Sequence, residues 1–211
     1  LKRLNMINEL KLILENRKLY AWKVSIAEIT RHNIYYTKNL DKESILQSFR
    51  FNIDIIVYKS LGNDIGESSF SIILNDNNSI LDEKSINKKI DDALLLCDYS
   101  KKPSFNLPMP GKLSQCVVVD NKLKKPMKYL EQIYNKIVFE LKKHKNIIVN
   151  NLELHSSHLN FRITNSNSID YKDMKTSLYV ELTLTAINNG QLQEHVAMTE
   201  VVSLSKFNAT K

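Results

Sequence analysis

The sequence has few of the residues on which disulfide-stapled, metal-stabilised or fibrous proteins depend. Its two cysteines, Cys97 and Cys116, are too few for a disulfide framework or a four-cysteine zinc site. Four glycines leave little material for a Gly-rich phosphate-binding loop, a collagen repeat or a flexible linker. No run of apolar residues approaches the roughly 18 that a membrane-spanning helix requires. What remains is a globular protein of 211 residues, 43% hydrophobic, which is long enough to bury a substantial core.

Arginine is also scarce, although the chain is basic. The formal net charge is +7, but only five of the 30 basic residues are Arg. Bidentate recognition of phosphates and guanines favours Arg over Lys. We therefore interpret the lysines as solvated surface and do not expect a nucleic-acid partner.

The two cysteines are each predicted to be buried apolar residues. Cys97 falls on the apolar stripe of a predicted helix, and Cys116 opens the apolar run 117–119. Free cysteines and the lack of a recognisable signal peptide predict a reducing, cytoplasmic location.

Hydrophobic periodicity divides the first half of the chain into two helices and four strands. Helices are predicted at 6–17 and 83–97, the second with the stripe Ile86, Ile90, Ala93, Leu94 and Cys97. Strands are predicted at 22–27, 32–37, 49–57 and 69–74, with a turn at 62–64 between the last two.

The second half repeats this order after a stretch that contains three of the four prolines. Residues 99–112 carry Pro103, Pro108, Pro110 and Gly111, so we predict an ordered linker there. A helix is predicted at 127–145, followed by strands at 147–154, 159–163, 178–187 and 191–202. The last two strands are joined by Asn188-Asn189-Gly190, a strong hairpin signal.

The predicted fold class is α+β, with mostly antiparallel sheets covered by helices. Because both halves run helix then four strands, we predict a duplicated helix-plus-four-strand unit. A chance match between two stretches of ordinary α+β pattern is the alternative. The predicted domains are 1–98, the linker 99–112, and 113–211.

No set of side chains makes a convincing catalytic or metal site. His155 and His158 are the only close histidine pair, but in an extended strand residues three apart point to opposite faces. His195 lies in the last hairpin and joins them only if the fold brings it near. The zincin, nucleophile-elbow, Walker and Rossmann patterns are all absent. We therefore assign no catalytic, cofactor-binding or metal-binding residue in this chain.

Several segments, in order, resemble the TldD/PmbA family, the modulator-of-DNA-gyrase family of candidate zinc metallopeptidases. They are the strand segments 21–29, 35–38 and 49–58, the strand start Ile65-Gly-Glu-Ser-Ser-Phe70, the helix 86–97, the Pro-rich stretch Pro103-Ser-Phe-Asn-Leu-Pro108, and the turn Asn165-Ser-Asn-Ser-Ile-Asp170. At that turn Ser168 stands where the family usually has Gly. The resemblance covers about residues 6–205.

The resemblance implies the N-terminal region of a family member, an α+β assembly that precedes a C-terminal domain. Catalytic members carry a His-Glu-x-x-x-His zinc motif in that later domain, so zinc is expected only there and the catalytic domain is expected to be absent from this chain. Other members lack the motif and act as partners in a TldD–TldE type complex that degrades unfolded peptides or trims leader peptides. The implied partners are a peptide substrate and a second TldD/PmbA-like subunit, in a homo- or hetero-oligomer. Whether the protein is the peptidase, its motif-less partner or a gyrase-modulating interaction module is left open.

Overall fold

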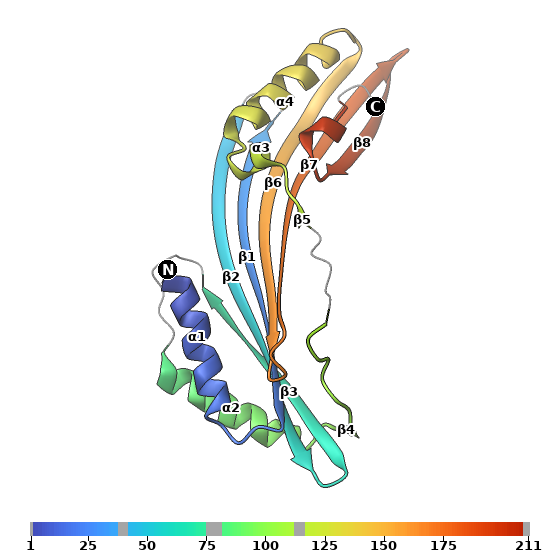
Figure 1. The fold of residues 1–211 in the computed structure, drawn as a ribbon. Coiled ribbons are helices and arrows are strands. Elements are labelled where there is room, and N and C mark those ends of the chain that lie inside the picture. Colours follow the sequence, from blue (N-terminus) through green and yellow to red (C-terminus); the bar gives the residue numbers. More distant parts are fainter. Residues whose placement is uncertain (1, 38–41, 75–81, 112–116, 209–211) are drawn as a thin grey trace. The chain divides into compact units, whose positions relative to one another are not determined.

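The structure, a computed structural model, describes residues 2–37, 42–74, 82–111 and 117–208 (Figure 1). Its helices are α1 (Lys2–Glu15), α2 (Glu83–Cys97), the short α3 (Asn121–Lys124) and α4 (Met127–Leu141), followed by a 3-10 turn, η2 (Leu204–Lys206). Its strands are β1 (Ala21–Tyr36), β2 (Lys42–Leu61), β3 (Asp64–Leu74), β4 (Lys101–Pro103), β5 (Val117–Val118), β6 (Ile147–Asn165), β7 (Asp170–Asn188) and β8 (Gln191–Val201).

The strands form a sheet in the order β4-β3-β2-β1-β6-β7-β5, and β8 also pairs with β7. The β2–β3, β3–β4 and β7–β8 pairs are antiparallel, whereas the two-residue β5 runs parallel to β7. The predicted α+β class with a mostly antiparallel sheet is confirmed.

Two predicted strand breaks are wrong. The strands predicted at 22–27 and 32–37 are the single strand β1, and those predicted at 147–154 and 159–163 are the single strand β6. The polar residues between them, such as Arg31 and the His155–His158 stretch, lie within the strands, because one face of a strand tolerates polar side chains. Within the described ranges each half of the chain therefore shows its first long helix followed by three long strands rather than four, namely α1 with β1, β2 and β3, and α4 with β6, β7 and β8.

Both predicted hairpin turns are confirmed. Leu61 pairs with Asp64 across Gly62, which has φ of 73°. Asn188 pairs with Gln191 across Asn189 and Gly190, whose φ angles are 48° and 79°. Two successive positive φ angles are the geometry that a two-residue hairpin needs, which explains Asn-Gly at this position.

The described residues form two compact units, each assembled from separate stretches of the chain. Unit 1 comprises 1–28, 50–115 and 160–173, and unit 2 comprises 29–49, 116–159 and 174–211. The long strands β1, β2, β6 and β7 contribute residues to both units. This division differs from the predicted contiguous domains 1–98 and 113–211 with a linker at 99–112, which stay a prediction.

In unit 1 two helices cover one face of the sheet. The apolar stripe of α2 is buried through Ile86, Ile90, Ala93 and Cys97, as its helical spacing predicts. From α1, Leu10 and Leu14 are buried, and Arg17 just beyond its end forms an ion pair with Asp91 of α2. On β2 the alternating residues Phe51, Ile53, Ile55 and Val57 are buried.

In unit 2 the helix α4 lies along the sheet (Figure 1). Its buried residues Leu130, Ile133 and Ile137 share one core with residues from three strands, namely Ile34 and Tyr36 of β1, Leu152 and Leu154 of β6, and Leu178 and Val180 of β7. The ring of Tyr36 stacks on Tyr134 of α4 at a centroid distance of 4.1 Å. Burial of Tyr36, with the neighbouring Tyr134 and Glu131, raises its pKa to about 12.

Cys97 is buried, as predicted, and its thiol contacts the carbonyl oxygen of Val57 at 3.7 Å. Burial raises the pKa of this thiol. Cys116 lies outside the described residues. None of the described helices has the length and apolar character needed to cross a membrane.

Candidate functional site

The sheet of unit 2 has a polar face, which points away from α4. Because side chains alternate along a strand, the residues between the buried core positions project to the opposite side. They include Asn33 and Tyr35 of β1, Asn151, Glu153, His155 and Ser157 of β6, and Ser177, Tyr179 and Glu181 of β7. We call this surface the polar face of unit 2.

Three ring side chains form a row across this face, one from each strand. The imidazole of His155 packs edge-on against Tyr35 at a centroid distance of 5.5 Å and tilted against Tyr179 at 5.6 Å. One row further along β6 and β7, Ser157 and Ser177 share a hydrogen bond of 2.8 Å between their hydroxyl groups. The row of rings is therefore a cross-strand contact between side chains on one face of the sheet.

Two carboxylates lie next to the row of rings. Glu153 Oε2 is 2.8 Å from His155 Nε2, and the hydroxyl of Tyr179 donates to Glu181 at 2.6 Å. The hydrogen bond to Glu181 raises the pKa of Tyr179, since the neutral phenol is the donor. His155 and Glu153 are each about a quarter exposed, so this pair is accessible to a binding partner.

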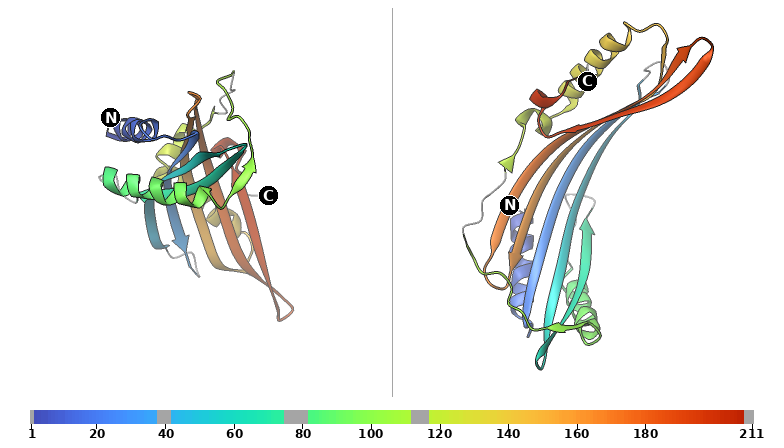
Figure 2. Two further views of the ribbon diagram at one scale, coloured as in Figure 1. Left: turned by 90° about the horizontal axis from the view of Figure 1, so that it is seen from below. Right: turned by 90° about the vertical axis from the view of Figure 1, so that its right-hand side faces the viewer.

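The strand β8 continues this face to the edge of the sheet. In the β7–β8 register Tyr179 faces Glu200, Glu181 faces Met198, Thr183 faces Val196 and Thr185 faces Glu194. Directly opposed residues point to the same face, so β8 adds two more carboxylates and two apolar side chains to the polar face. Figure 2 shows the β7–β8 hairpin at the end of the sheet.

The histidines considered for a metal site do not converge. His155 belongs to the polar face, whereas His158, three residues later on the same strand, points to the other side. His195 pairs with Leu184, whose side chain lines a groove on the α4 side. Across the described ranges no group of three or more His, Cys, Asp and Glu side chains is placed to hold a metal ion.

Two hollows lie on the α4 side of unit 2. A cavity of about 560 Å³ is bounded by α3, α4 and η2 and includes Asp120, Lys122, Tyr129, Lys136 and Phe207. A groove of about 460 Å³ lies between α4 and the hairpin, and most of its lining is apolar, including Ile137, Leu141, Ile147, Leu182, Leu184, Ala197 and Phe207. The groove exists because α4 leaves part of β7 and β8 uncovered.

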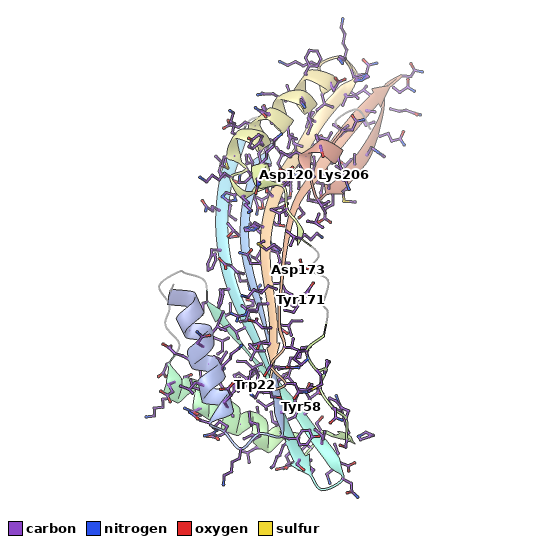
Figure 3. All side chains as sticks on the ribbon, in the orientation of Figure 1. Trp22, Tyr58, Asp120, Tyr171, Asp173 and Lys206 are labelled. Atoms are coloured by element: carbon purple, nitrogen blue, oxygen red, sulfur yellow. The ribbon has the colours of Figure 1, made fainter. Side chains whose placement is uncertain are left out.

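Asp120 connects two short helical turns in unit 2 and lies near Lys206 (Figure 3). Its carboxylate accepts hydrogen bonds from the backbone N–H groups of Lys122 and Leu204, both at 2.9 Å, and from the hydroxyl of Ser203 at 3.0 Å. Partial burial acts to raise the pKa of Asp120, but these three hydrogen bonds outweigh it and hold the pKa below its ordinary value. Asp120 therefore has a structural role as a cap for α3 and η2.

The turn between β6 and β7, in unit 1, is the centre of a second hydrogen-bond network, which sequence reasoning did not identify as such. The buried side chain of Asn165 accepts from the N–H groups of Asn167 and Ile169 and donates to the carbonyl oxygen of Pro108 at 3.1 Å. Asn167 donates to the carbonyl oxygen of Leu107 at 2.8 Å. The sequence signal that could have identified this network is the resemblance of both 103–108 and 165–170 to the same family, because the structure joins these two segments by hydrogen bonds.

The same turn holds the start of β1 in unit 1. Trp22 and Ser166 are linked twice, by the N–H of Ser166 to the carbonyl of Trp22 at 3.0 Å and by the N–H of Trp22 to the hydroxyl of Ser166 at 3.4 Å. Ser168 has a positive φ of 63°, a conformation that favours glycine. The position at which this chain departs from the family pattern is therefore a left-handed one.

No protein-family model and no curated protein sequence matches the chain. Solved structures do. A candidate modulator of DNA gyrase from Thermotoga maritima matches with a TM-score of 0.75 and 12% identity, over 97% of this chain and 44% of its own. The chain has the fold of the part of that protein that it covers.

Two further structures agree. TldE from Thermococcus kodakarensis matches with a TM-score of 0.67 and 14% identity, over 93% of this chain and 43% of its own. A candidate modulator of DNA gyrase from Bacteroides thetaiotaomicron matches with a TM-score of 0.69 and 14% identity, over 95% of this chain and 45% of its own. The chain spans less than half the length of each of these proteins.

Proposed function

We propose that this chain is the N-terminal region of a TldD/PmbA-like protein that acts on unfolded or leader peptides in the cytoplasm. Its role there is to supply scaffold, substrate enclosure and a subunit interface. The observation that carries the proposal is the fold shared with a candidate gyrase modulator over 97% of this chain. The segments 103–108 and 165–170, which resemble the family in sequence, are joined by hydrogen bonds from Asn165 and Asn167 to the carbonyl oxygens of Pro108 and Leu107, and this adds support from the residues themselves.

In this proposal the hydrolytic zinc belongs to a later domain of a catalytic family member. The polar face of unit 2 offers His155 and Glu153 as a pair, and a zinc site needs a third and usually a fourth ligand. We therefore expect the purified chain to bind no stoichiometric zinc. Elemental analysis that finds about one tightly held zinc per chain would contradict this expectation and make His155 the first ligand to substitute.

The alternative is a non-catalytic partner of the TldE kind, or an interaction module of the gyrase-modulator kind. The similarity to TldE favours it. In either case the protein would assemble with a second TldD/PmbA-like subunit.

One experiment separates the two. The full gene product that contains this chain is purified, its zinc content is measured, and its activity is assayed on an unfolded peptide, alone and with its co-purifying subunit. A His-Glu-x-x-x-His motif, one zinc and peptide cleavage together identify the peptidase. Cleavage that requires a second, motif-bearing subunit identifies the partner role, and no cleavage with either preparation contradicts a role in peptide degradation.

A further inference from the structure

The strand β8 is an edge strand with few of the features that normally protect an edge. Among the described residues it pairs with β7 alone, and its first ten residues are exposed. Natural edge strands are kept from pairing by charged side chains, lysine above all, by prolines, by bulges or by short length. β8 has eleven residues with no Lys, Pro or Gly, and its register with β7 runs unbroken from Leu178↔Val201 to Asn188↔Gln191, which leaves no bulge.

Apolar side chains are exposed on this strand. Leu192 is 70% exposed, Met198 is 65% exposed and Val196 is 44% exposed. On its other side the strand borders the apolar groove that α4 leaves open, with Ala197 in the groove lining. A strand added to β8 would cover apolar surface on both faces of the sheet.

The charge of the hairpin is opposite to that of the chain. The protein has a net charge of +7, yet no Lys or Arg occurs between Lys175 and Lys206. The same stretch contains Glu181, Glu194 and Glu200, all of which point to the polar face. These carboxylates disfavour pairing of β8 with a second acidic strand and favour a basic one.

We propose that β8 is a docking strand for an extended, basic segment of a partner polypeptide, which adds to the sheet of unit 2 by antiparallel or parallel pairing. Lys or Arg side chains at alternate positions of that segment face Glu194 and Glu200. The intervening apolar side chains lie over the groove beside α4. Backbone hydrogen bonds give affinity and the alternation of side chains gives selectivity. The inference rests on the proposed function, in which this chain is a scaffold that binds polypeptides. It names β8 as the binding strand and charge pairing with main-chain hydrogen bonds as the chemistry.

The test uses fluorescein-labelled peptides of about twelve residues, a length that matches β8. One peptide alternates Lys with Leu, a second has Glu in place of each Lys, and a third has the Lys–Leu sequence with every backbone nitrogen methylated. Fluorescence anisotropy at about 0.15 M salt measures binding to the purified chain. The Lys peptide is expected to bind at least about tenfold more tightly than the Glu peptide, and N-methylation is expected to abolish binding, because strand addition needs the N–H groups.

A charge reversal on β8 supplies the matched variants. Glu194→Lys with Glu200→Lys is expected to invert the preference, so that the Glu peptide binds better. Glu9→Lys with Glu15→Lys changes the net charge equally on α1 of unit 1 and is expected to leave the preference unchanged. Thermal unfolding checks that both variants are folded, and the N-methylated peptide tests the proposal on the unaltered chain in any case.

Three results would overturn the proposal. One is equal binding of the Lys and N-methylated peptides, which indicates charge attraction without strand pairing. Another is loss of binding in the α1 variant as large as in the β8 variant. The third is a dimer of the unaltered chain that the β8 reversal dissociates, which makes a second copy the occupant. None of them affects zinc content or peptide cleavage by the full gene product, so failure here is distinguishable from failure of the proposed function.

Discussion

Gly66 of β3 lies directly against the backbone carbonyl group of Cys97 at the end of α2. A Cβ at position 66 would overlap this carbonyl and also lie 2.8 Å from the Cβ of Cys97. Just beyond this contact, the N–H of Glu67 donates to the carbonyl oxygen of Ser100 at 3.2 Å. The close approach of helix and strand in unit 1 thus depends on the missing side chain at one position.

We expect Gly66→Ala to destabilise unit 1 by about 1–3 kcal/mol, the range of an overpacked core, because the nearest blocking atoms belong to the backbone and cannot rotate away. Urea unfolding followed by circular dichroism measures the change. Gly111→Ala is the matched control, since nothing lies within 4 Å of a Cβ at Gly111. Equal midpoints for the two variants would contradict the close packing.

We expect Ser168→Gly to stabilise the protein. Glycine removes the steric cost of the left-handed conformation at φ of 63°, which raises the free energy of unfolding by about 1–2 kcal/mol. The greater conformational freedom of glycine in the unfolded chain lowers it by about 0.4–1 kcal/mol. A net gain of roughly 0.5–1 kcal/mol follows from these two figures.

Ser168→Ala is the matched control for this prediction. It removes the hydroxyl and keeps the strained φ, so no comparable gain is expected. If both variants gain equally in thermal unfolding, the hydroxyl and not the backbone is responsible.

The carboxylate of Asp120 should make unfolding dependent on pH in the acid range. Its pKa in the folded protein lies below the ordinary value of 3.8. A depressed pKa stabilises the folded state in full above the unfolded-state value, and this contribution is lost as pH falls through the folded-state pKa.

The difference in unfolding free energy between the unaltered chain and Asp120→Asn should therefore be constant above about pH 5 and shrink below about pH 4. Glu9→Gln, at an exposed position of α1 away from these turns, is the control. A difference that persists unchanged to pH 2 would contradict the assignment.

Cys97 should be protected from thiol reagents as long as unit 1 is folded. Its side chain is fully buried, so a reagent cannot reach the sulfur. Burial also raises the pKa of the thiol, so little of the reactive thiolate forms. In a Cys116→Ser background, Ellman's reagent should react with no thiol in native buffer and with one in urea. Rapid reaction in native buffer would show that α2 does not stay on the sheet.

Local signals predicted much of the fold because their causes are local. The stripe of α2 from Ile86 to Cys97 follows from the helical period, and the β7–β8 hairpin follows from the positive φ angles that Asn189 and Gly190 tolerate. The full length of β1 and β6 does not follow from the sequence, because polar residues such as His155 are typical of a turn between strands, whereas here they lie on a face of the sheet that no described helix of unit 2 covers. The polar face itself depends on register, since Tyr35, His155 and Tyr179 meet only after three strands are aligned, and no sequence period encodes that alignment.

The turn at Asn165 has a consequence for how the protein is made. Trp22 and Ser166 are separated by 144 positions and Leu107 and Asn167 by 60, yet all four meet in unit 1. When a nascent chain has emerged from the ribosome as far as residue 100, both α1 and α2 are present without the partners that fix the start of β1 and the Pro-rich stretch. Until residue 170 emerges, the start of β1 and the Pro-rich stretch lack these hydrogen-bond partners and leave strand edges unpaired. Nascent chains of intermediate length should therefore be the forms that need a chaperone.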